Sequence, residues 1–159
     1  MRVIAFDPGY ERLGVALLEK NSGKDVVLFS TTVRTNKEDD FPTRLAILAS
    51  AVESFINTHT PTHCAMEKLF FQKNQKTAMK VAEVRGMLLH IAKSHNLIIE
   101  EYSPQEVKIA ITGEGRSDKR SMMRLLPKLV SLPRTDMLDD EYDAIAIGIT
   151  SLAYYREKR

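Results

Sequence analysis

Three strand-like segments follow one another within the first 35 residues, joined by connections too short to hold a helix. They occupy residues 2–7, 13–20 and 25–35, and an Asn-Ser-Gly turn sequence separates the second from the third. Strands joined this closely pair antiparallel, because a parallel connection needs about a dozen residues or more. The chain is therefore predicted to begin with an antiparallel meander of three strands.

After this meander, helical and strand-like patterns alternate. Apolar residues recur at helical spacing over residues 41–57 and 75–94, and a short apolar run follows each helix, at residues 62–68 and 97–102. This order predicts an α/β fold. We expect a five-stranded mixed sheet, in which three antiparallel strands are followed by parallel strands, with helices on both faces.

The last third of the chain is predicted to be helical, in three pieces. Ser103 has the features of an N-cap, with Pro104 at the first helical position and Glu106 closing a capping box. A second helix is expected to begin at a cap on Ser117. The third covers residues 139–155.

Length and cysteine content limit the class of protein. A chain of 159 residues can bury one core, so residues 1–159 are interpreted as a single domain. Cys64 is the only cysteine, which excludes an intrachain disulfide and is compatible with a reducing cytoplasm. No apolar run approaches the ~20 residues of a membrane-spanning helix, and the N-terminus does not resemble a signal peptide. We therefore expect a cytoplasmic protein.

The net charge of +2 decides nothing about nucleic acid, but the charges are unevenly distributed. Basic residues form two clusters, and acidic residues gather elsewhere, at residues 36–41 and 136–143. The basic clusters are Lys68, Lys73, Lys76, Lys80 and Arg85, and Lys108, Arg116, Lys119, Arg120 and Arg124. Such separation lets a protein hold phosphates and a metal ion together. The alternative is that the basic clusters are simply solvated helix faces.

Acidic residues stand at three places that the predicted fold brings to one edge of the sheet. Asp7 ends the first strand and Glu67 ends the fourth, and these two strands are expected to be central parallel neighbours. Asp140 and Asp143 share one face of the first turn of the last helix. Each has a simpler explanation by itself: a turn residue before Pro8, a solvated strand end, or acids favoured at a helix N-terminus.

Together, these four carboxylates repel one another unless a cation neutralises them. Oxygen ligands select Mg²⁺ or Mn²⁺ over zinc, and two such ions about 4 Å apart form a site for phosphoryl transfer. The histidines offer no competing site, because they lie on different elements and are interpreted as structural or surface residues. They are His59, His63, His90 and His95.

Four blocks of the sequence span nearly the whole chain: FDPGYERLGVALLE, MEKLFFQKNQKTAMKVAEVRG, EYSPQEVKIAITGEGRSDKR and DDEYDAIAIGIT. In order and in spacing they resemble the RuvC-type Holliday-junction resolvases, a family of crossover junction endodeoxyribonucleases. The resemblance implies an RNase H-like fold. It also implies a metal-dependent nuclease that resolves four-way DNA junctions by paired symmetric nicks and leaves 5′-phosphate and 3′-hydroxyl ends.

The resemblance implies a metal site made of three aspartates and one glutamate. By position this site falls on Asp7, Glu67, Asp140 and Asp143, which would hold two Mg²⁺ ions, with Mn²⁺ as a substitute. Asp139 adjoins Asp140 and is the alternative at that position. We choose Asp140 because its spacing to Asp143 matches the family block.

The same resemblance implies residues that act on DNA. Lys108 and Lys119 match two functional lysines, and Lys119 is the candidate for stabilising charge on the phosphate. Phe70 matches an aromatic residue that acts at the opened junction, although Phe71 beside it leaves open which ring does so. The other basic residues expected to bind DNA are Lys73, Lys76, Lys80, Arg85, Arg116 and Arg120.

A four-way junction is close to two-fold symmetric, so two symmetric nicks call for a homodimer. The helix over residues 75–94 carries apolar residues beyond its core stripe, and these form either the dimer face or part of a fully buried helix. They are Met79, Val84, Met87 and Ile91. Branch migration, if it is coupled to cleavage, is left to separate motor proteins.

Three other functions share parts of this pattern. Actin-like and sugar-kinase-like ATPases carry a similar Asp-x-Gly loop, but they need a second such domain to close over the nucleotide. A non-catalytic junction-binding protein would keep the basic residues and lose acids, whereas all four acids are present here. A nuclease of the same fold acting on another branched or damaged DNA remains the third alternative.

Overall fold

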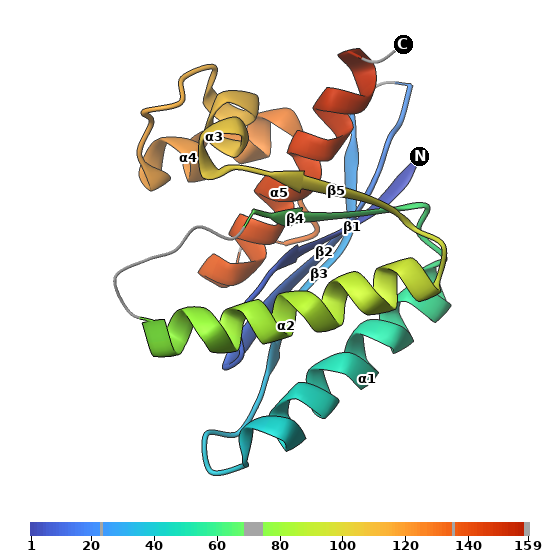
Figure 1. The fold of residues 1–159 in the computed structure, drawn as a ribbon. Coiled ribbons are helices and arrows are strands. Elements are labelled where there is room, and N and C mark those ends of the chain that lie inside the picture. The colour runs from blue at the N-terminus through green and yellow to red at the C-terminus, as the bar shows by residue number, and fades with distance from the viewer. Residues whose placement is uncertain (23, 69–74, 135, 158–159) are drawn as a thin grey trace.

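The computed structural model describes residues 1–22, 24–68, 75–134 and 136–157, with residues 75–76 and 156–157 described by their backbone alone. The described residues form a single sheet with helices on both sides (Figure 1). In chain order the elements are β1 (Arg2–Asp7), β2 (Arg12–Glu19), β3 (Val26–Arg34), α1 (Phe41–His59), β4 (His63–Glu67), α2 (Gln75–Ser94), β5 (Ile98–Tyr102), α3 (Pro104–Thr112), α4 (Lys119–Leu129) and α5 (Asp139–Glu157).

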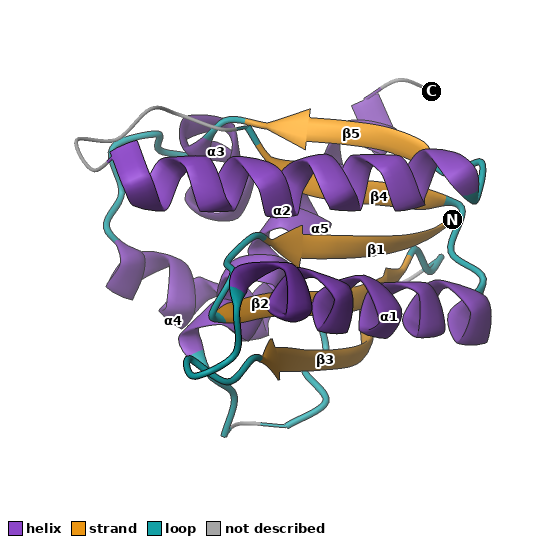
Figure 2. Cartoon of the chain, turned by 60° about the horizontal axis from the view of Figure 1, so that its bottom comes forward, coloured by secondary structure: helices purple, strands orange, loops and turns teal. Residues whose placement is uncertain are grey.

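The sheet has five strands in the order β3-β2-β1-β4-β5, which Figure 2 shows one beside the next. β2 pairs antiparallel with both β1 and β3, whereas β4 pairs parallel with both β1 and β5. The predicted order of three antiparallel strands followed by parallel ones is confirmed. The prediction that the first and fourth strands are central parallel neighbours is confirmed as well.

Helices α1 and α2 cover one face of the sheet, and α3, α4 and α5 cover the other (Figures 1 and 2). The face under α1 and α2 carries large side chains such as Phe6. The face under α5 carries alanines at three strand positions, Ala5, Ala16 and Ala65. These small side chains let the largely buried helix α5 lie close to the strands.

The start of α3 follows from its capping residues. Ser103 Oγ accepts a hydrogen bond from Glu106 N at 3.2 Å, and a Glu106 carboxylate oxygen accepts one from Ser103 N at 2.7 Å. Pro104 occupies the first helical position. The predicted capping box is confirmed, and it fixes the helix that carries Lys108.

The predicted cap of α4 was wrong by one residue. Asp118, not Ser117, caps this helix, because the Asp118 carboxylate accepts a hydrogen bond from Ser121 N at 2.8 Å. The Ser117 hydroxyl is engaged elsewhere, as the acceptor of a 2.8 Å hydrogen bond from Thr112 Oγ1. The first residue of α4 is therefore Lys119.

The histidines with described contacts lie in structural surroundings. His63 is buried with its Nδ1 2.8 Å from Thr62 Oγ1, and the His59 ring stacks on Phe29. Cys64 is free and buried in β4. In the part of the chain that the structure describes, no helix has both the length and the apolar character needed to cross a membrane.

Candidate active site

Strand alternation directs Asp7 and Glu67 to the same side of the sheet. In β1, Ala5 joins the core under α5 whereas Phe6 joins the core under α1 and α2, so Asp7 points toward α5. In β4 the same alternation places Met66 away from α5 and Glu67 toward it. Phe6 and Met66 are paired in the parallel ladder, which makes the next residues, Asp7 and Glu67, neighbours at its end.

Helix α5 brings two more carboxylates to these strand ends because Gly14 leaves room for its first turn. Gly14 pairs with Asp7 in the sheet, and a Cβ on Gly14 would lie 2.1 Å from the Asp140 backbone oxygen and 3.1 Å from Asp7 Cβ. Any side chain at this position would push the helix away. Asp140 and Asp143 consequently come close enough to act electrostatically on Asp7.

The Asp7 carboxyl titrates far from its usual range. Burial, together with the negative charges of Asp143, Asp140 and Glu67, raises the pKa of Asp7 from 3.8 to about 7, against an opposing effect of Lys119. Burial and Asp143 also raise the pKa of Glu67. Carboxylates in this situation favour either a proton or a nearby cation.

Two cationic side chains already lie against the acids of α5. Lys119 Nζ donates a hydrogen bond to Asp143 Oδ2 at 2.8 Å and lies 3.6 Å from Asp139 Oδ2, while Arg12 Nε lies 3.3 Å from Asp140 Oδ2. Burial lowers the pKa of the Lys119 ammonium, but the contacts with Asp143 and Asp139 outweigh this effect and raise the pKa overall. Lys119 is therefore a charged partner of the acidic cluster.

The donor set fits a hard divalent cation. Asp140 Oδ2 is buried and accepts no hydrogen bond from any described residue, although Arg12 lies beside it. The Arg12 guanidinium offsets part of the cost of burying this oxygen, and a divalent cation bound directly to it would offset more. Among the described residues, no group of three His, Cys, Asp or Glu side chains is already arranged as a metal site. Binding would therefore require Asp140 and Asp143 to turn from their present cationic partners.

A cavity of about 230 Å³ opens beside the acids, and side chains of both charges line it. Asp7, Glu67 and Asp143 supply the negative charges of this lining, and Lys108 and Lys119 supply the positive ones. Lys108 is close enough to Glu67 to lower its pKa, against the larger effect of burial. The cavity therefore offers carboxylate ligands for a cation and ammonium groups for an anion, which is the combination that a phosphate diester with bound metal needs.

The geometry favours Asp140 over Asp139 as a member of the acidic cluster. The Asp139 side chain is 68 % exposed and contacts Lys119, whereas the Asp140 side chain is 17 % exposed and lies beside Arg12. Only the charge of Asp140, of these two, contributes to the raised pKa of Asp7. Adjacent residues of a helix point in different directions, so Asp139 and Asp140 cannot both face the acidic cluster, and Asp140 is the one that does.

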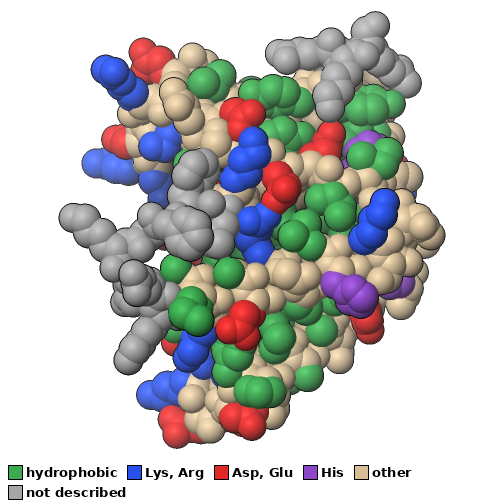
Figure 3. All heavy atoms as spheres, viewed as in Figure 1, with side chains coloured by type: hydrophobic (Ala, Val, Ile, Leu, Met, Phe, Trp, Pro, Cys, Tyr) green, Lys and Arg blue, Asp and Glu red, His purple; other side chains and the backbone are tan. Residues whose placement is uncertain are grey.

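The predicted DNA-binding residues fall into different surroundings. Lys80 Nζ lies over the rings of Tyr10, at 4.9 Å, and Phe41, at 5.6 Å. Arg116, in the connection between α3 and α4, and Arg120, in the first turn of α4, are both exposed. Figure 3 shows Lys and Arg side chains gathered over the region that Figure 1 labels α3 and α4. Four predicted residues lie outside the described side chains: Phe70, Phe71, Lys73 and Lys76.

Arg85 does not form part of an exposed basic stripe, contrary to the pattern suggested by the sequence. Its side chain is 12 % exposed and forms an ion pair with Glu101, on β5. Burial lowers the pKa of the Arg85 guanidinium. In the described structure, the Arg85 guanidinium therefore joins α2 to β5 and is not exposed for DNA.

The surplus apolar residues of α2 divide between core and surface. Val84 and Ile91 are buried in the core under α2, and Met87 is partly buried against it. Met79 is 66 % exposed. The alternative that α2 is fully buried is therefore wrong, because Met79 is exposed. The other three residues belong to the core of this chain.

Sequence reasoning missed two residues of this site, Arg12 and Gly14. A glycine inside a strand is a known signal of close backbone approach, so Gly14 was detectable in principle. Arg12 gave no such signal. Its contact with Asp140 joins the start of β2 to the start of α5, and that contact depends on the tertiary structure.

The chain matches the family model described as crossover junction endodeoxyribonuclease RuvC over residues 3–151. Among curated relatives, the crossover junction endodeoxyribonuclease RuvC of Petrotoga mobilis is 38 % identical over 146 residues, which cover 92 % of this chain and 90 % of the relative. The RuvC of Halothermothrix orenii is 36 % identical over 159 residues, covering 100 % of this chain and 96 % of the relative.

Solved structures give the same result for the fold. Thermus thermophilus RuvC, solved in complex with a Holliday junction substrate, superposes with a TM-score of 0.92 at 26 % identity, covering 99 % of this chain and 96 % of that one. The yeast mitochondrial Holliday junction resolvase Ydc2 has a TM-score of 0.69 at 17 % identity, with 98 % and 82 % covered, and supports the RNase H-like fold alone. The chain belongs to the RuvC family of crossover junction endodeoxyribonucleases.

Proposed function

We propose that this chain resolves four-way DNA junctions by hydrolysing one phosphodiester on each of two opposed strands, leaving 5′-phosphate and 3′-hydroxyl ends. The observation that carries the proposal is the convergence of acids from three elements of the fold, beside Lys119, in a member of this family. The similar Thermus thermophilus protein was solved with a Holliday junction substrate, which supports junction DNA as the partner here.

We assign Asp7, Glu67, Asp140 and Asp143 as the ligands of Mg²⁺, or of Mn²⁺ in its place, with two ions in the site. When bound, these ions would activate water and stabilise charge on the phosphate. The support lies in the raised pKa of Asp7 and in the buried Asp140 oxygen that accepts no hydrogen bond from the described residues. Both features disfavour the fully ionised cluster without a bound metal ion.

The lysines that line the cavity act on the substrate in this proposal. Lys119 holds its ammonium at the acids by the hydrogen bond to Asp143, and it can transfer this contact to a phosphate oxygen as negative charge develops there. Lys108 lines the same cavity and would orient the scissile phosphate. Neither lysine needs to lose its proton to do so.

We propose a wider DNA interface around this cavity. Lys80, Arg116 and Arg120 would contact backbone phosphates, and their contribution is expected to weaken as salt rises. The Lys80 ammonium lies over two aromatic rings, which limit its motion. Lys73, Lys76, Phe70 and Phe71 belong to the same proposal, with one phenylalanine stacking on unpaired bases. Arg85 would reach DNA only after leaving Glu101.

Two nicks related by symmetry imply a homodimer, which we propose with exposed Met79 as part of its contact surface. Sedimentation of the 18.0 kDa chain is expected to show a dimer, and a strict monomer that still makes paired cuts would contradict this arrangement.

Separate motor proteins would drive any branch migration. The free, buried Cys64 is consistent with a reducing location such as the cytoplasm.

The function is tested by comparing a synthetic four-way junction with a linear duplex of the same arms, with and without Mg²⁺. We expect paired, symmetric nicks in the junction only, and only when Mg²⁺ or Mn²⁺ is present. Undiminished cutting in excess chelator would refute the metal site. Faster cutting of a flap or a damaged duplex than of the junction would assign another substrate.

A further inference from the structure

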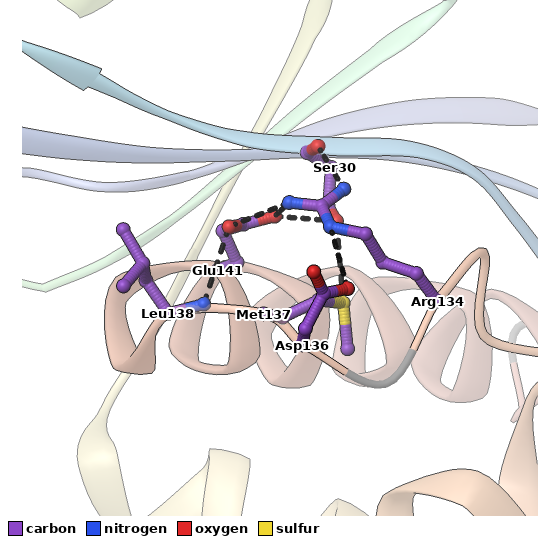
Figure 4. A network of polar contacts seen from close by, with 6 residues as sticks. All are labelled: Ser30, Arg134, Asp136, Met137, Leu138 and Glu141. Carbon is purple, nitrogen blue, oxygen red and sulfur yellow. Dashed lines mark hydrogen bonds and ion pairs between the residues drawn. The ribbon is translucent and has the colours of Figure 1, made fainter.

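Glu141, which lies between Asp140 and Asp143 in the sequence, is the buried centre of a network of polar side chains (Figure 4). Glu141, only 2 % exposed, accepts two hydrogen bonds from Arg134 Nη2, at 2.7 and 2.9 Å. It also accepts one from Ser30 Oγ at 2.8 Å. Arg134 is held in turn by a hydrogen bond to the Ser30 carbonyl at 3.3 Å and by Asp136, 3.5 Å away.

Glu141 also defines the start of α5. Its carboxylate accepts a hydrogen bond from Leu138 N at 3.2 Å, and the Leu138 carbonyl accepts from Glu141 N and Tyr142 N. This is the acidic half of a capping box, and it satisfies a backbone donor where leucine, at the cap position, has no side-chain oxygen to offer. The network therefore joins the first turn of α5 to β3, the edge strand that contains Ser30.

The position of the first turn of α5 determines where Asp140 and Asp143 lie. Of the residues from Asp139 to Tyr142, only Glu141 is buried. The turn is also held by Tyr142, which packs against the core under α5, by contacts of Asp140 with Gly14 and Arg12, and by those of the acids with Lys119. Arg12 and Lys119 face the carboxylates that would bind metal, so their contacts would change on binding, whereas the contacts of Glu141 point away toward β3 and would not.

We infer that Glu141 and Arg134 are positioning residues: the ion pair between the buried Glu141 and the half-exposed Arg134 holds the first turn of α5 where the Asp140 and Asp143 side chains can reach a divalent cation. The inference rests on the proposed nuclease function and goes beyond it, because neither residue touches the cavity that would hold DNA. Arg134 also neutralises Glu141, so that this additional carboxylate does not increase the repulsion among the four acids.

The test is the double variant Arg134→Met/Glu141→Met, which removes the pair together so that no unpaired charge stays buried. We expect the single-turnover cleavage rate to fall about 20-fold or more and the half-saturating Mn²⁺ concentration to rise about tenfold. Amide hydrogen exchange at residues 140–143 should become about tenfold faster. Junction affinity in chelator should stay within about twofold, because it depends on phosphate contacts elsewhere.

The matched control is Arg2→Met/Glu19→Met, which removes an ion pair of 3.2 Å between β1 and β2 and should leave all four quantities unchanged. Ser30→Ala removes only one donor to Glu141 and should move rate, metal requirement and exchange in the same direction by less. If the double variant does not fold, the rate, the Mn²⁺ requirement and the amide exchange of Ser30→Ala test the positioning role instead. Glu141→Gln keeps acceptor and shape and should recover part of the loss.

Unchanged Mn²⁺ requirement and unchanged exchange at residues 140–143, with a rate loss equal to the unfolded fraction, would overturn the positioning role and leave a purely structural network. If the wild-type chain cleaves and the variants cleave equally well, this inference alone is refuted. If the wild-type chain does not cleave junctions at all, the proposed function is refuted, and the positioning role with it.

Discussion

Asp7→Asn is expected to slow junction cleavage by about 10³-fold or more while leaving junction binding within about threefold. Asn keeps the size of the side chain but removes the charge at the centre of the acidic cluster, where burial and three other carboxylates already act on Asp7. Loss of transition-state charge stabilisation of this kind has effects of about this size or larger. Single-turnover cleavage, with binding measured in chelator, gives both quantities.

Asp139→Asn is the matched control for this substitution. Asp139 carries the same side chain and directly precedes Asp140, but it is largely exposed and does not contribute to the pKa of Asp7. Its variant should cleave within a few-fold of the wild type. Loss of binding in Asp7→Asn would mean that Asp7 is structural, and equal loss of cleavage in both variants would mean that the choice of Asp140 over Asp139 was mistaken.

The same Asp7 substitution has a second expected effect, on the pH dependence of metal-free stability. The pKa of Asp7 is about 7 in the folded protein and 3.8 as its ordinary value, so between these pH values the folded chain holds a proton that the unfolded chain has lost. Asp7 therefore makes its full contribution to the free energy of unfolding below about pH 4. That contribution, up to about 4 kcal/mol, is lost as pH rises through 7.

In chelator at pH 8, Asp7→Asn should accordingly be more stable than the wild type by about 2–4 kcal/mol, and the difference should vanish near pH 4. Added Mg²⁺ should stabilise the wild type at pH 8 and leave the variant nearly unchanged. Urea denaturation at the two pH values measures this. Identical pH dependence of the two proteins would show that the Asp7 carboxyl is not under the strain that its surroundings imply.

Gly14→Ala is the second substitution with a large expected effect. The added Cβ would lie 2.1 Å from the Asp140 backbone oxygen, and backbone cannot rotate aside as a side chain can. The start of α5 must therefore move away from Asp7. We expect a loss of about 1–3 kcal/mol in the free energy of unfolding and a cleavage rate reduced by about 100-fold, because displaced ligands no longer converge.

Gly148→Ala separates these two effects. It adds the same methyl group to the same helix, but there the Cβ would meet Leu18 Cδ1 at 2.2 Å, the end of a side chain that can change rotamer. This variant should lose stability and keep most of its cleavage rate per folded molecule. Equal rates per folded molecule in both variants would show that the approach of α5 to β2 does not set the catalytic geometry.

The sequence determined the elements and their order because local signals agreed with one another. Alternating apolar residues, the capping box at Ser103 and the short connections among the first three strands each depend on neighbours along the chain, and the structure confirms them. The cap of α4 was misplaced because Ser117 and Asp118 are both good caps, and a contact of Ser117 with Thr112 decided between them.

The candidate acids could be proposed from sequence for a related reason. The ends of strands and the first turn of a helix can be located in a sequence to within a few residues. The side chains at those places, Asp7, Glu67, Asp140 and Asp143, could therefore be expected at one edge of the sheet. The structure does bring them into electrostatic contact. Their role as metal ligands is the proposal that Asp7→Asn tests.

Only the tertiary structure decided what surrounds those acids. Arg12 on Asp140 and Arg85 on Glu101 join residues from different elements, and Arg134 pairs with Glu141 from the connection that precedes α5. No periodic pattern in the sequence encodes these contacts. The closeness of α5 to Asp7 likewise depends on the absent side chain of Gly14. Local sequence thus set which elements form and in what order, because those interactions are short-range, whereas packing of distant elements set the charges and contacts around the site.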